Sequence, residues 1–93
     1  MPRRTVRLRI TGRVQGVWYR GWTVETATAL GLDGWVRNRA DGSVEAVFHG
    51  DADAVEAMLA RAHDGPPSAK VESIDVQEHD QTPAPGFHQR PTD

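Results

Sequence analysis

The chain has 93 residues, a formal net charge of −2 and no cysteine. This length fits one small domain covering residues 1–93, and the lack of cysteine excludes disulfides, thiolate nucleophiles and cysteine-based metal sites. No apolar run approaches the ~20 residues of a membrane span, and the basic N-terminus alternates in polarity, so we expect a cytoplasmic protein without a signal peptide.

The charge is distributed unevenly along the chain. Residues 1–50 carry a net charge of +4, whereas residues 51–93 carry −6. A basic half attracts anionic partners through its electrostatic field. Alternatively, the arginines near the N-terminus form the solvated face of an exposed strand; these are Arg3, Arg4, Arg7 and Arg9.

The first third of the chain predicts a strand, a loop and a helix. Residues 5–12 alternate in polarity, which is typical of a half-buried strand. Residues 22–30 are predicted as a helix that Gly31 ends in a left-handed conformation. One face of this helix carries side chains at helical spacing, namely Tyr19, Thr23, Ala27 and Leu30.

The rest of the chain predicts two strands, a helix and another strand. The Asp-Gly pair at residues 41–42 predicts a hairpin turn. A cap at Asp51 or Asp53 and a Gly-Pro-Pro stop at residues 65–67 delimit the second helix. The expected elements are strands at 34–39 and 44–49, a helix at 51–63, a strand at 70–78, a loop at 80–86, and a short edge strand or frayed tail at 87–93.

This element order, βαββαβ, predicts the ferredoxin-like α+β sandwich. In that arrangement two helices pack on one face of an antiparallel four-stranded sheet, and the first and third strands are central. A short fifth strand at one edge is possible near Phe87.

The segment GRVQGVWYR, residues 12–20, is a candidate anion site. It leads from a strand through a glycine-containing loop into a helix N-terminus, where backbone N–H groups and the helix dipole favour negative charge. Gly16 permits a close backbone approach to a ligand, and the guanidinium of Arg20 can grip two phosphate oxygens. The alternative is a structural turn with a surface arginine.

Two kinds of phosphate chemistry are excluded by this segment. Thiol-dependent phosphatases place a cysteine, five residues and an arginine in sequence, and here Val14 occupies the cysteine position. The segment also lacks the lysine and the Ser or Thr of a nucleotide-binding GxxxxGK[ST] loop.

Asn38 is a second candidate. Asparagine is disfavoured within strands, and its amide offers both a donor and an acceptor that could orient a water molecule at the loop. Alternatively, Asn38 starts the hairpin turn.

In order and spacing, GRVQGVWYRGWT, LGLDGWVRN and DGSVEA closely resemble motifs of the acylphosphatase family. HGDADAVEAML and GPPSAKVESIDV extend the resemblance over residues 5–78. It implies the same α/β sandwich and hydrolysis of acyl phosphates, which are carboxyl-phosphate mixed anhydrides, to carboxylate and inorganic phosphate by direct in-line attack of water.

The resemblance also implies roles for particular residues. Arg20 and Asn38 match the catalytic positions, and Asn38 would orient the water. The phosphate-binding group comprises Gln15, Gly16, Val17, Trp18, Tyr19 and Arg20. No metal or other cofactor is expected, and the four histidines lack the spacing of metal ligands. We expect a monomer whose partner is a small-molecule acyl phosphate, without nucleic-acid or membrane partners.

A non-catalytic anion- or RNA-binding module of the same fold is the alternative. Sheets of this topology bind RNA through paired aromatic side chains on the sheet. The first strand instead carries Arg7, Arg9 and Thr11.

Overall fold

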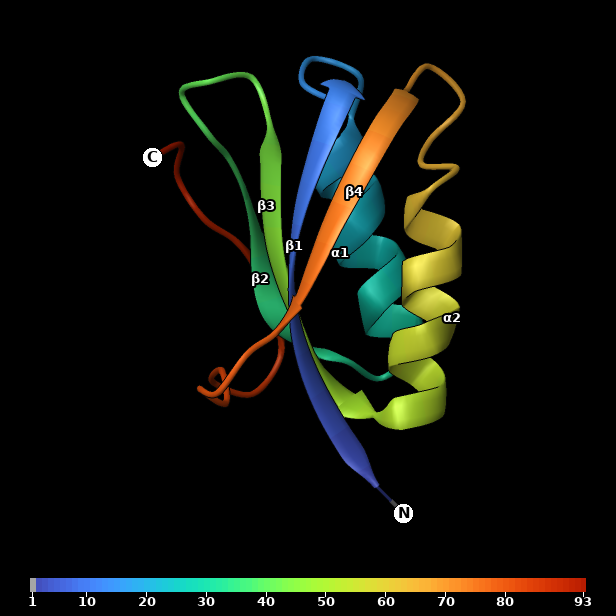
Figure 1. Cartoon of the computed structure of the whole chain (residues 1–93), viewed down its shortest axis with the longest axis vertical. Helices are drawn as coiled ribbons and strands as arrows, with labels where there is room; N and C mark the ends of the chain where they lie inside the picture. The colour runs from blue at the N-terminus through green and yellow to red at the C-terminus, as the bar shows by residue number, and fades with distance from the viewer. Residues whose placement is uncertain (1) are drawn as a thin grey trace.

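A computed structural model describes residues 2–93 and arranges them as two helices against one face of a sheet (Figure 1). The strand order β4-β1-β3-β2-β5 places β1 and β3 in the interior, as the sequence predicts. The elements are β1 (Arg3–Arg13), α1 (Tyr19–Ala29), β2 (Asp33–Asn38), β3 (Val44–Asp51), α2 (Ala52–Ala62), β4 (Lys70–Glu78) and β5 (Phe87–Gln89). Neither helix in this described part is long and apolar enough to cross a membrane.

The predicted antiparallel four-stranded sheet is confirmed for β1 to β4, and the fifth strand at its edge makes the whole sheet mixed. β5 pairs with β2 in parallel, with Gly34 opposite Phe87. The reason lies in the connection from β4, which leaves one sheet edge and crosses to the opposite edge before β5 begins. Residues 87–89 form the edge strand, and the following residues stay hydrogen-bonded to β2, through Arg90 N to Val36 O at 2.9 Å and Asp93 N to Asn38 O at 3.1 Å.

Helix α1 begins three residues earlier than the sequence predicts. The carbonyl of Trp18 accepts a hydrogen bond from Trp22 N at 3.0 Å, so the first turn of the helix runs from Tyr19 and already includes Gly21. The predicted end is confirmed, since Gly31 has a φ of 72° and its N–H donates to Thr28 O at 3.0 Å. A residue in left-handed conformation after the last turn is the usual helix stop.

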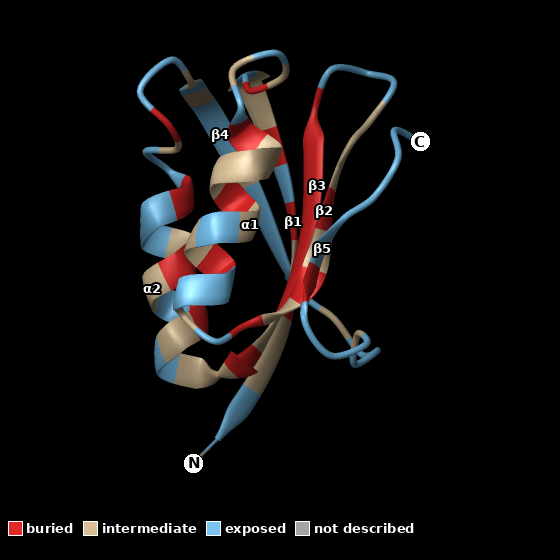
Figure 2. Cartoon of the chain, turned by 180° about the vertical axis from the view of Figure 1, so that it is seen from behind, coloured by how far each residue is buried: buried red, intermediate tan, exposed pale blue. Residues whose placement is uncertain are grey.

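The core lies between the helices and the sheet, where Figure 2 shows the buried residues concentrated. The alternation in β1 and the predicted face of α1, apart from the half-buried Leu30, supply part of it, and one face of α2 supplies the rest. Its side chains include Val6, Leu8, Ile10, Tyr19, Ala27, Val55, Met58 and Ala62. Burial raises the pKa of Tyr19, and its hydroxyl donates to Ala62 O at 2.6 Å, which fixes the start of α1 against the end of α2.

The other face of the sheet is held by ion pairs around Glu45, whose side chain is only 4 % exposed. Arg7 Nε donates to one carboxylate oxygen at 2.5 Å. Arg37 Nε and Arg39 Nη1 donate to the other at 2.7 and 3.0 Å. Burial alone would raise the pKa of the Glu45 carboxyl, but the hydrogen bonds from the three arginines lower it to about 2. Glu45 therefore stays ionised and links β1, β2 and β3.

Candidate active site

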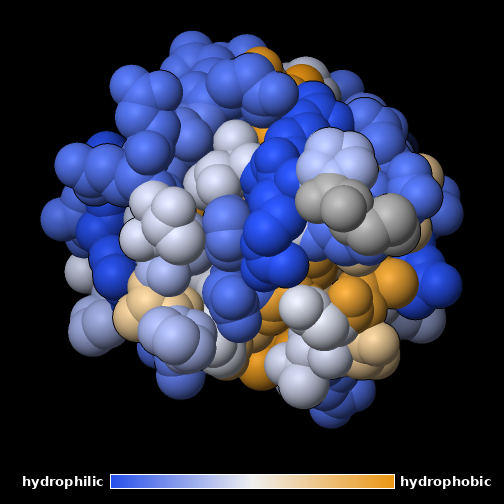
Figure 3. Space-filling view, turned by 90° about the horizontal axis from the view of Figure 1, so that it is seen from below, coloured by the Kyte–Doolittle hydropathy of each residue, from blue (hydrophilic) through white to orange (hydrophobic). Residues whose placement is uncertain are grey.

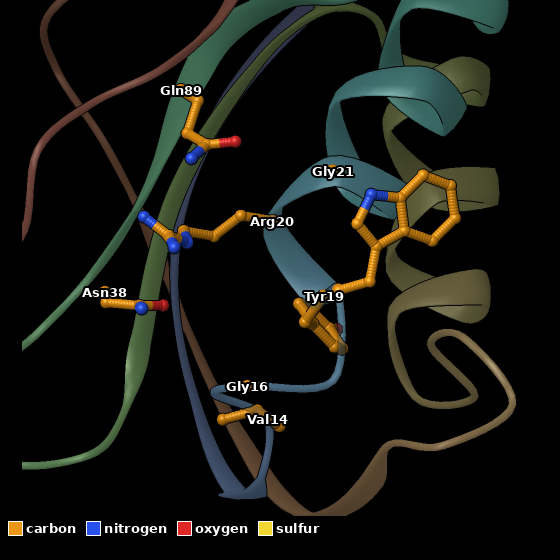
Figure 4. Close-up of a pocket in the computed structure, with 8 residues that line it drawn as sticks. Val14, Gly16, Tyr19, Arg20, Gly21, Asn38 and Gln89 are labelled. Carbon is orange, nitrogen blue, oxygen red and sulfur yellow. The ribbon is translucent and has the colours of Figure 1, made fainter.

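A cavity of about 160 Å³ opens beside the start of α1. The loop after β1 forms one side, and β2 and β5 form the other (Figure 4). Its lining residues are Val14, Gly16, Trp18, Tyr19, Arg20, Gly21, Asn38 and Gln89. Of the seven predicted site residues, the cavity brings together Gly16, Trp18, Tyr19, Arg20 and Asn38, and it leaves out Gln15 and Val17.

The loop backbone has the geometry of an anion nest. Gly16 and Trp18 have left-handed φ values of 73° and 68°, while Val17 between them has a negative φ. An alternation of positive and negative φ values turns successive backbone N–H groups toward one point. Helix α1 starts directly after Trp18, without a side-chain cap and without an acidic residue in its first turn. Its first N–H groups and its dipole are therefore available to an anion.

Trp18 is the one non-glycine residue with positive φ among residues 2–93. Such a conformation costs of order 1–3 kcal/mol and is concentrated at functional sites. Gly21 leaves room for the Trp18 side chain in this conformation, since a Cβ at Gly21 would lie 2.1 Å from the indole nitrogen. The glycine one turn into the helix therefore accommodates the indole, and the loop keeps its strained shape.

Arg20 extends from the first turn of α1 toward Asn38 and Gln89 (Figure 4). Its guanidinium makes no ion pair or hydrogen bond with any side chain of residues 2–93, although it is half-buried. By contrast, Arg7, Arg37 and Arg39 all bind carboxylates. The donors of Arg20 are thus free for a ligand in the cavity.

Asn38 ends β2 and faces Arg20 across the cavity (Figure 4). Within the part of the chain that the structure describes, its Oδ1 is the only buried side-chain nitrogen or oxygen without a hydrogen-bond partner. A buried polar atom left unpaired costs about 1–3 kcal/mol. The amide oxygen is therefore positioned to accept from a group that enters the cavity.

The side chain of Gln15 connects the loop after β1 to the β2–β3 turn by hydrogen bonds. Its Nε2 donates to Arg39 O and to Ser43 O, both at 2.8 Å. The turn is itself braced by Asp41, which accepts from the backbone and the hydroxyl of Ser43. Gln15 therefore connects the segment that carries Arg20 to the hairpin that carries Asn38.

Three lining residues were not predicted from the sequence. Val14 and Gly21 flank the predicted segment. A glycine three residues after the bulky Trp18, one turn further along the helix, is the sequence signal that could have indicated Gly21. Gln89 comes from β5 and turns its amide toward Arg20 (Figure 4). Its place depends on the parallel pairing of β5 with β2, which no local pattern indicates.

Among residues 2–93, no three His, Asp or Glu side chains are grouped so that they could hold a metal ion. The cavity instead combines backbone N–H groups, an unpaired guanidinium and a neutral amide, which is a donor set for an oxyanion.

On this βαββαβ sandwich, the strand–loop–helix turn is the kind of site that favours an oxyanion. The family model described as Acylphosphatase matches residues 6–89, and the chain belongs to the acylphosphatase family.

Relatives and solved structures agree with this assignment. The acylphosphatase of Rhodospirillum rubrum is 61 % identical over 89 residues, which cover 96 % of this chain and 98 % of that one. The acylphosphatase of Rhizorhabdus wittichii is 60 % identical over 92 % of this chain and 87 % of its own. The structure of an acylphosphatase from Coxiella burnetii superposes with a TM-score of 0.91 at 31 % identity, covering 95 % of this chain and 93 % of that one.

Proposed function

We propose that the protein hydrolyses acyl phosphates to a carboxylate and inorganic phosphate, with Arg20 and the loop N–H groups binding the phosphoryl group and Asn38 orienting the water. The single observation that carries the proposal is that two polar groups without partners lie on opposite sides of one cavity. The unpaired guanidinium of Arg20 and the unpartnered Oδ1 of Asn38 both face it.

The reaction requires little from the protein beyond placement and charge stabilisation. The oxygen of water forms a bond to phosphorus while the bond from phosphorus to the acyl oxygen breaks, and the carboxylate leaves with the electron pair. Because a carboxylate is a good leaving group, no general acid is needed. Phosphoryl transfer depends mainly on positioning and on stabilising the three equatorial oxygens. Arg20 and the N–H groups of residues 15–19 would supply that stabilisation.

Asn38 acts on the water and not on the phosphoryl group in this proposal. Its amide is neutral and cannot serve as a base at neutral pH. The buried Oδ1 accepts a hydrogen bond from the water and so aims a lone pair at phosphorus. The proton of the water passes to an oxygen of the phosphoryl group or of the departing carboxylate, since no side-chain base lines the cavity.

The test is hydrolysis of benzoyl phosphate in the presence of EDTA by the wild type, Arg20→Ala and Asn38→Ala. Loss of one preorganised donor to a developing oxyanion lowers kcat by about 10²–10³-fold, and we expect at least that from Arg20→Ala. Asn38→Ala should lower kcat with a smaller effect on the affinity for inorganic phosphate. Arg61→Ala, which removes an exposed arginine of α2, serves as the matched control. Full activity in both site variants would refute the assigned roles.

The non-catalytic alternative of an anion- or RNA-binding module is not favoured. The open sheet face presents Arg7 and Arg9, each paired with a carboxylate, where RNA-binding sheets carry paired aromatic residues. The proposal also includes a monomeric enzyme in the cytoplasm that binds neither nucleic acid nor membranes. These points stay predictions from the sequence.

A further inference from the structure

The connection between β4 and β5 covers part of the sheet face that has no helix. It lies on the side opposite α1 and α2 in both views of the molecule (Figures 1 and 2). Both of its ends are fixed: His79 N donates to Thr5 O at 3.0 Å, and Gly86 N donates to Asp33 Oδ1 at 2.9 Å. A segment anchored in this way forms a wall over the sheet.

A second cavity of about 360 Å³ lies between this wall and the sheet. It is larger than the cavity beside Arg20, at about 160 Å³, and it falls in the size range of small-molecule sites. The sheet supplies Arg7, Trp35, Arg37 and Glu45 to its lining, and the chain after β5 supplies Arg90.

The cavity has an excess of positive charge. Three arginines against the one carboxylate of Glu45 leave a net charge of +2 among the lining residues. Asp93 pairs with both Arg37 and Arg39, each at 3.4 Å, and the opposite charges of Asp93 and Arg39 together leave this excess unchanged. A concave surface of one charge sign focuses the field and attracts ions of opposite charge.

The guanidinium groups are held in place before any ligand binds. Arg37 and Arg90 lie over the ring of Trp35, with their Cζ atoms 4.9 and 4.6 Å from its centroid. Such stacking restrains the guanidinium plane and leaves its edge N–H groups for hydrogen bonds. Arg90 makes no side-chain ion pair within residues 2–93, and Arg7 uses only its Nε in the described hydrogen bonds.

Glu45 cannot neutralise the remaining donors. Both of its oxygens already accept hydrogen bonds from arginines, and its side chain is 4 % exposed. The unused guanidinium N–H groups of Arg7 and Arg90 therefore require another acceptor, either water or an anion.

We infer that this cavity binds a small oxyanion with two or more negative charges, carried by phosphate or carboxylate groups, at a site separate from the one beside Arg20. Arg7 and Arg90 would bind the oxyanion groups, and Trp35 would hold the guanidinium of Arg90 beside that of Arg37. The sheet separates the two sites, because Gln89 faces the cavity beside Arg20 while the adjacent Arg90 faces the second one.

The test is NMR titration of the Trp35 indole N–H, assigned with Trp35→Phe, using pyrophosphate and citrate as separate probes. Arg20→Ala serves as the background, so that binding beside Arg20 does not contribute. We expect a saturable shift of the Trp35 resonance with at least one probe, and Arg90→Gln should weaken it about tenfold, since one charge-assisted contact is lost. The amide spectrum of Arg90→Gln checks its fold.

Arg61→Gln is the matched control, since it makes the same charge change on the opposite face of the sheet. Its affinity should stay close to that of the Arg20→Ala background. A response to pyrophosphate alone would support a phosphate site, and a response to both probes would support a general oxyanion site. No saturable shift with either probe, or equal weakening by Arg90→Gln and Arg61→Gln, would overturn the inference.

Discussion

Replacing Glu45 with glutamine tests how much the open sheet face depends on one buried charge. The substitution keeps the shape of the side chain but removes the negative charge that three arginines share. The lowering of the Glu45 pKa from 4.5 to about 2 corresponds to roughly 3 kcal/mol of folding free energy. Removing one partner of a buried ion pair costs about 3–5 kcal/mol, which agrees in magnitude.

The pH dependence of this effect has a defined sign. The folded-state pKa is depressed, so the stabilisation is complete above the unfolded value of 4.5 and is lost as the pH falls toward about 2. Urea denaturation of the wild type and Glu45→Gln at pH 7 should differ by about 3 kcal/mol. The difference should shrink steadily below pH 4.5, because protonated Glu45 is also neutral.

Glu25→Gln is the control for this experiment, since Glu25 is exposed on α1 and makes no ion pair within residues 2–93. It should leave the free energy of unfolding nearly unchanged. Equal stability of Glu45→Gln and the wild type at pH 7, or a difference that does not vary with pH, would refute the reasoning.

Three other substitutions test particular contacts. Gln15→Ala frees the loop from the β2–β3 turn, so kcat should fall about tenfold or more while circular dichroism stays native; an unchanged kcat would contradict the linking role. Tyr19→Phe removes the hydrogen bond to Ala62 O and should lower the free energy of unfolding by about 1–2 kcal/mol, and a neutral result in denaturant titration would argue against that bond. Gly34→Ala places a Cβ 1.8 Å from Val47 O at a φ of 140°, so thermal melting should show severe destabilisation, and a melting temperature near the wild-type value would exclude this backbone geometry.

Much of the fold follows from local patterns in the sequence. The alternation of Val6, Leu8 and Ile10 predicts the buried face of β1. The spacing of Val55, Met58, Leu59 and Ala62 predicts the buried face of α2, where all but the half-buried Leu59 are fully buried. Each pattern reports a physical period, two for a strand and 3.6 for a helix. The direction of β5 has no such signal, because it depends on where the connection after β4 crosses the sheet.

The candidate site also combines features that the sequence predicts with features that it does not. The loop sequence and the unusual asparagine at a strand end draw attention to Arg20 and Asn38, and the structure brings both to one cavity. The left-handed backbone of Trp18 was not predictable, since its steric cost argues against it and the space for the indole depends on the tertiary position of Gly21. The bonds from Gln15 also join backbone groups 24 and 28 residues away, and such pairing needs the tertiary fold.

The parallel strand β5 has a consequence for how the protein reaches its active form. The cavity beside Arg20 combines a loop near the N-terminus, the end of β2 and a residue of β5, so its parts are joined only by long-range contacts. Contacts between distant parts of a chain form slowly, because closing the intervening loop costs entropy before the contact stabilises the fold. If Gln89 is required, recovery of hydrolysis during refolding reports the docking of β5, whereas recovery of helical circular dichroism reports α1 and α2. A lag between the two signals would measure the lifetime of a folded sandwich that lacks its last strand.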